Sequence, residues 1–74
     1  MNAKVYKQIH SFSKQVSYYI DMEYDSYYSE YYKKHMNDTR FVDFVGSYYL
    51  GGNNVPDTAR YVVELITMIH NDQA

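Results

Sequence analysis

The side chains best suited to binding chemistry gather between residues 17 and 40. The segment 17–32 holds seven tyrosines and four acids with no lysine or arginine, and a short basic patch follows it. Cations bind phosphate, and aromatic rings stack on bases. A nucleotide or other small ligand could therefore be held by Tyr28, Tyr32, Lys33, Lys34 and Arg40. The same cations would equally suit the C-terminal end of a helix.

The tyrosines themselves favour contact with another protein. Tyrosine supplies a large contact area at low entropic cost and is enriched at protein interfaces. We expect an acidic, tyrosine-rich helical face that binds a protein partner through Tyr18, Asp21, Asp25, Tyr28 and Tyr32. We expect three further tyrosines to fill the core instead, namely Tyr24, Tyr27 and Tyr31. The simpler alternative is that the acids only keep a helix face soluble.

Metal binding is not predicted. Asp21, Glu23 and Asp25 match alternate positions of a calcium loop, but Ser26 stands where glycine is needed and Tyr32 where a bidentate glutamate is needed. The chain has no cysteine, so thiolate sites are excluded. The three histidines lie far apart in the sequence, at His10, His35 and His70.

Catalysis has little support in the sequence. There is no glycine-rich phosphate loop and no nucleophile elbow, and a core this small predicts no deep pocket. We therefore expect a protein that is not an enzyme and that needs no cofactor.

Length and composition predict one globular domain spanning residues 1–74. Hydrophobic residues make up 46% of the chain and charged residues 22%, a balance that favours folding over disorder. No apolar run is long enough for a signal peptide or a membrane span, so a cytoplasmic protein is expected. The net charge of −2 argues against direct DNA binding.

Helical spacing of apolar residues predicts the elements that carry these side chains. From Val5 to Tyr31 the apolar positions step by three or four, which predicts a helix over about 3–35. A break at Asp25-Ser26 is left open, because either residue could cap a new helix. The alternation of apolar and acidic residues over 20–25 would also allow a short strand.

Two further helices are predicted over about 38–50 and 55–71. Three good capping residues precede the first of them, and Gly51 follows it where a left-handed C-terminal cap is wanted. Pro56 suits the first turn of the last helix. Apolar residues cover about 200° of that helix, so we expect it to be surrounded, either by both other helices or by another copy of the chain. Because Arg60 is its only cation, it does not resemble a DNA-reading helix.

These elements predict an all-α domain of three helices, with a long first helix and a C-terminal helical hairpin, that forms a homodimer or a larger homo-oligomer. The first helix and the apolar arc of the last one would supply the contact. Antiparallel pairing of first helices would bring the lysines of one chain near the acids of the other, since Lys4, Lys7 and Lys14 precede the acidic run.

The leading hypothesis for function is a non-enzymatic protein-binding module that blocks its partner. Small cysteine-free chains with such a surface look like the accessory inhibitors of phages and mobile elements, including anti-defence proteins. The alternative is an oligomer that sequesters a nucleotide or another small ligand at a subunit boundary.

Overall fold

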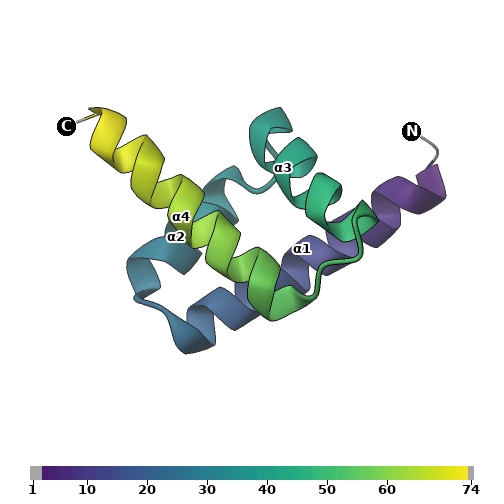
Figure 1. Cartoon of the computed structure of the whole chain (residues 1–74), viewed down its shortest axis with the longest axis horizontal. Helices are drawn as coiled ribbons and strands as arrows, with labels where there is room; N and C mark the ends of the chain where they lie inside the picture. The colour runs from purple at the N-terminus through teal and green to yellow at the C-terminus, as the bar shows by residue number, and fades with distance from the viewer. Residues whose placement is uncertain (1–2, 74) are drawn as a thin grey trace.

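Four α-helices make up the computed structural model, which describes residues 3–73 (Figure 1). They are α1 (Ala3–Glu23), α2 (Ser26–His35), α3 (Thr39–Leu50) and α4 (Val55–Gln73). No strand occurs in the described part of the chain, so the all-α prediction is confirmed and a strand over 20–25 is excluded. The expected count of three helices is wrong, because the first predicted helix is divided into α1 and α2.

The division falls at the position that the capping residues allowed. Asp25 leaves the helical backbone with φ −57° and ψ 141°, and its Oδ1 accepts a hydrogen bond of 2.9 Å from the Tyr27 amide. A continuous helix over 3–35 would be about 50 Å long. The longest extent of the molecule is 37 Å, so the chain must turn back to bury the apolar face of its second part.

Small side chains let α2 pack closely along α1. Ser13 and Ser17 of α1 and Ser29 of α2 are all buried. The Ser29 hydroxyl donates to Asp21 Oδ1 at 2.8 Å and also lies 3.1 Å from the Ser26 carbonyl oxygen. These bonds satisfy a buried hydroxyl, and the bond to Asp21 links α2 to α1.

The two helices of the C-terminal half lie close to their predicted ranges. The Asn54 side chain caps α4 by accepting a 2.9 Å bond from the Asp57 amide. The predicted role of Gly51 is wrong: its φ is −79°, and Gly52 takes the positive φ of 84°. The left-handed step therefore comes one residue later, in the turn between α3 and α4.

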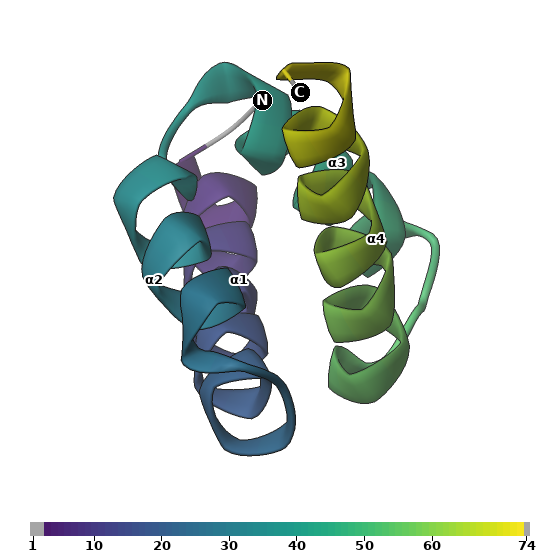
Figure 2. The same cartoon turned by 90° about the vertical axis from the view of Figure 1, so that its left-hand side faces the viewer.

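The core lies where α4 crosses the pair formed by α1 and α2. Figure 2 shows α1 and α2 side by side with α4 facing them, and α3 also contacts both α1 and α4. Seven of the described core residues are completely buried, namely Val16, Ile20, Tyr32, Val45, Ala59, Val62 and Ile66. The wide apolar arc of α4 is thus largely covered by the chain's own helices, as one of the two predicted arrangements required.

The side-chain cap that Asp25 forms at the start of α2 should stabilise the fold. We expect Asp25→Ala to lower the free energy of unfolding by about 1 kcal/mol, because the Tyr27 amide loses its acceptor. Asp25→Asn keeps a side-chain oxygen at the cap and should stay close to wild type. Urea denaturation followed by circular dichroism measures both, and equal stability of all three proteins would contradict the capping role.

Candidate functional site

One face of α1 is left uncovered by the other helices. Its central residues lie on one side of the helix, and we call them the α1 outer face: Ser11, Lys14, Gln15, Tyr18 and Met22. Tyr18 is 66% exposed and Met22 is 58% exposed, although both are large apolar side chains. Since they lie one turn apart, they form a continuous apolar contact surface.

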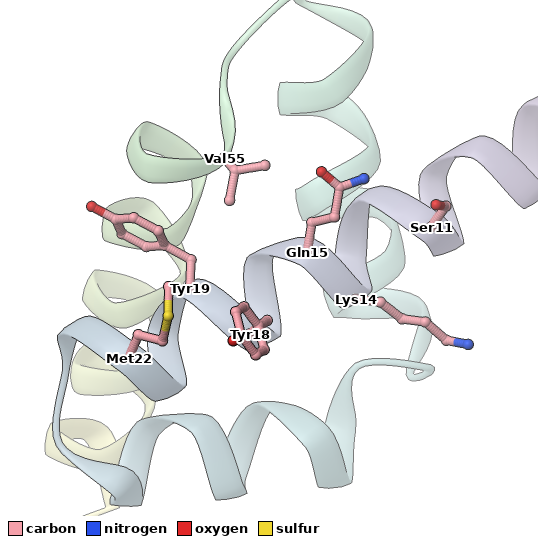
Figure 3. Close-up of a pocket in the computed structure, with 7 residues that line it drawn as sticks. All are labelled: Ser11, Lys14, Gln15, Tyr18, Tyr19, Met22 and Val55. Carbon is pink, nitrogen blue, oxygen red and sulfur yellow. The ribbon is translucent and has the colours of Figure 1, made fainter.

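A shallow groove runs along this face. It has a volume of about 490 Å³ and is completed by the half-buried Tyr19 and by Val55 at the start of α4. Figure 3 shows Lys14 toward one end of the lining, Met22 toward the other, and Val55 on the neighbouring helix. Apolar surface with a cation at one end is a suitable floor for a helix or an extended segment of another protein.

Acidic side chains stand at the C-terminal end of the α1 outer face. Asp21 and Asp25 follow Tyr18 at intervals of three and seven residues, and both are exposed. Each also has a structural bond, Asp21 with Ser29 and Asp25 with the Tyr27 amide. These bonds hold the carboxylates at the corner between α1 and α2, where a basic partner could approach them.

The structure brings only part of the predicted partner-binding set to the surface. Tyr18, Asp21 and Asp25 are exposed, whereas Tyr28 is half-buried against the core. Tyr32 has no exposed surface, so the expectation that it contacts a partner is wrong. The reason is the break at Asp25, after which α2 folds back and turns Tyr32 toward α1 instead of away from it.

The same break moves a predicted core tyrosine outward. Tyr24 and Tyr31 pack against the core in half-buried positions, but Tyr27 is 41% exposed and its assignment to the core is wrong. The Tyr27 hydroxyl lies 3.2 Å from Nδ1 of His70, and its ring meets the His70 ring edge-on. Tyr27 therefore ties α2 to the end of α4.

Tyr32 is the largest fully buried side chain in the core. Its ring packs edge-on against Phe41, with centroids 5.7 Å apart. The hydroxyl makes no well-formed hydrogen bond among the described residues. Burial raises the pKa of Tyr32 to about 12, and the Ser13 side chain offsets that rise only in part.

The alternative ligand site loses one of its five expected residues in this fold. Lys33, Lys34 and Arg40 are exposed, but the buried Tyr32 ring cannot stack on a base. The hollow nearest in sequence to these cations measures about 260 Å³ and is lined by Tyr6, Asn37, Thr39, Val42 and Asp43. That lining carries an acid and no cation, so it does not suit a phosphate.

A histidine and a carboxylate meet at the turn between α2 and α3. His35 Nδ1 lies 2.9 Å from Asp38 Oδ2, and the His35 ring packs on Tyr31 with centroids 4.4 Å apart. Sequence reasoning missed this pair, although its spacing of three residues was a usable signal. In the described part of the chain, no three metal-ligating side chains come together to hold an ion.

Sequence reasoning also missed most of the groove. Met22 lies four residues after Tyr18, which was the available signal for one lining residue. Tyr19 and Val55 could not be paired from sequence, because they come from different helices.

Comparisons with known proteins leave the site to be interpreted from its own geometry. No family model matches the chain, and neither the curated proteins nor the solved structures include a significant match. Among the described residues, no helix has both the length and the apolar character needed to cross a bilayer.

Proposed function

We propose that the protein is a non-enzymatic binding module that uses the α1 outer face to bind and block another protein. The observation that supports this best is the exposure of Tyr18 and Met22 side by side over a groove of about 490 Å³. Rings and thioethers adapt to varied apolar surfaces and are favoured in binding faces.

The charges around the groove define the chemistry of the partner. Asp21 and Asp25 lie toward the Met22 end, and no lysine or arginine occurs between residues 17 and 32. A complementary partner presents apolar side chains at helical spacing, followed by lysine or arginine opposite these acids. The apolar anchors supply affinity, and the charges orient the partner along the groove.

A peptide-display selection against the purified protein tests this function. We expect enriched peptides to combine apolar residues spaced by three or four with a basic flank. Replacing Tyr18 and Met22 together by serine should weaken binding of those peptides at least tenfold, because both central anchors are lost. Titration monitored by fluorescence anisotropy measures the change.

Met68 provides a matched control for this experiment. Its exposure of 61% is close to that of Met22, but it lies on α4 and does not line the groove. Met68→Ser should therefore bind the selected peptides like wild type. Enrichment of acidic peptides, or equal loss of binding in the Met68 variant, would contradict the proposed site.

A further inference from the structure

We propose that α1 also pairs antiparallel with α1 of a second copy of the protein, across the α1 outer face. The pairing is a property of the chain alone, so it can hold whether or not the proposed function is correct. It rests on the spacing of the exposed residues and on the order of their charges.

A stripe of exposed residues that passes through this face follows a coiled-coil repeat. Intervals of three and four residues alternate along α1 through Lys4, Lys7, Ser11, Lys14, Tyr18 and Asp21. Such a repeat keeps one stripe of a helix facing a neighbouring helix. All six side chains are exposed in the single chain, so the other helices leave this stripe largely uncovered.

The charges on the stripe are complementary to those of a second copy. Lys14 precedes Tyr18 on the stripe, and Asp21 follows it. A two-fold axis perpendicular to the helix brings Lys14 of each copy toward Asp21 of the other. Parallel pairing would instead place like charges together, so the charge order selects the antiparallel arrangement.

The apolar residues fix where the axis passes. Tyr18 and Met22 are the large apolar side chains on the exposed face, and an axis beside Tyr18 buries both of them. Lys14 and Asp21 then lie at nearly equal distances on either side of the axis. Lys14 of each copy consequently approaches Asp21 of the other, which gives two equivalent ion pairs per dimer.

Weak, salt-sensitive association is expected from such an interface. One exposed helix face buries less surface than a standard stable interface. The ion pairs are solvent-exposed, so raising salt beyond about 0.1 M screens them. Sedimentation equilibrium over a concentration series reaching about 1 mM, at low and moderate salt, covers the range in which such a complex forms.

Charge-reversal variants test the register. Lys14→Glu places two glutamates against two aspartates, and Asp21→Lys places two lysines against two lysines. We expect each variant alone to weaken self-association about tenfold, since two attractive pairs become repulsive. A mixture of the two variants should restore wild-type affinity, because the heterodimer recovers both opposite-charge pairs.

Two controls keep the experiment decisive. Ser29→Ala removes the hydrogen bond that Asp21 accepts within its own chain, and it should leave self-association unchanged. Circular dichroism of every variant verifies that the helices are intact. A monomer at all concentrations would overturn the proposal, and so would a dimer that is indifferent to salt or a mixture that fails to recover affinity.

Discussion

Tyr32→Ala will lower the free energy of unfolding by about 3–5 kcal/mol, the range observed when a large aromatic side chain is removed from a core. The ring has no exposed surface and packs against Phe41 at the junction of α1, α2 and α3. Its removal leaves a cavity that the surrounding helices can close only in part. Chemical denaturation followed by circular dichroism measures this loss.

Tyr32→Phe separates the ring from its hydroxyl. The phenylalanine variant should be as stable as wild type, or more stable by about 1 kcal/mol, because it removes a buried hydroxyl without a well-formed hydrogen bond. If the phenylalanine variant lost as much stability as the alanine variant, the hydroxyl rather than the ring would hold the core together.

The raised pKa of Tyr32 predicts that wild type and Tyr32→Phe differ in stability at alkaline pH. A tyrosine in the unfolded chain ionises near pH 10, whereas burial raises the pKa of Tyr32 to about 12 in the folded protein. Its contribution to stability is therefore complete below pH 10 and is lost as the pH rises from 10 toward 12. Tyr32→Phe lacks this group, so its stability should fall less than that of wild type across this interval.

Ile66→Ala will cost about 2–5 kcal/mol, the second large effect that we expect. Ile66 lies on α4 with no exposed surface, in the same core cluster as Ile20 of α1 and Tyr32 of α2. The Ile66 side chain fills space that neighbouring side chains cannot reach, so its truncation to alanine leaves a cavity. Thermal and urea denaturation should give the same order of stabilities.

Met68→Ala, two residues further along α4, is the matched comparison. Its side chain is 61% exposed, and the substitution should change stability by no more than about 0.5 kcal/mol. Similar losses for both variants would mean that the outer side of α4 is covered in solution. The effect of protein concentration on the unfolding midpoint would then show whether a second copy covers it.

The proposed protein partner and the proposed second copy both bind at the α1 outer face, so competition between them can be measured. A peptide or protein that fills the groove and a second copy that pairs over Tyr18 cannot occupy the face together. We expect ligands selected for the groove to dissociate the dimer. Simultaneous binding would assign the two contacts to different parts of the surface.

The sequence by itself determined the helical class and most helix boundaries of this protein. Spacings of three and four residues are imposed by the helix repeat, so they report local geometry directly. Helix capping is also local, because each cap involves residues close together in the sequence. The side chains of Asp25 and Asn54 accept hydrogen bonds from amides two and three residues later, and Gly52 adopts the positive φ of the turn before α4. The nearly continuous apolar arc of α4 likewise indicated that several neighbours would cover it.

Only the tertiary structure decided which tyrosines are buried and where the groove lies. Apolar spacing continues almost unbroken through Asp25, so it predicts Tyr27 in the core and Tyr32 at its edge. The extended ψ of 141° at Asp25 redirects the chain, and packing on α1 then selects the opposite side of α2. Which side of α2 is buried depends on how whole helices pack against one another. The same packing brings Tyr19 and Val55 to one groove, and no local sequence pattern encodes either result.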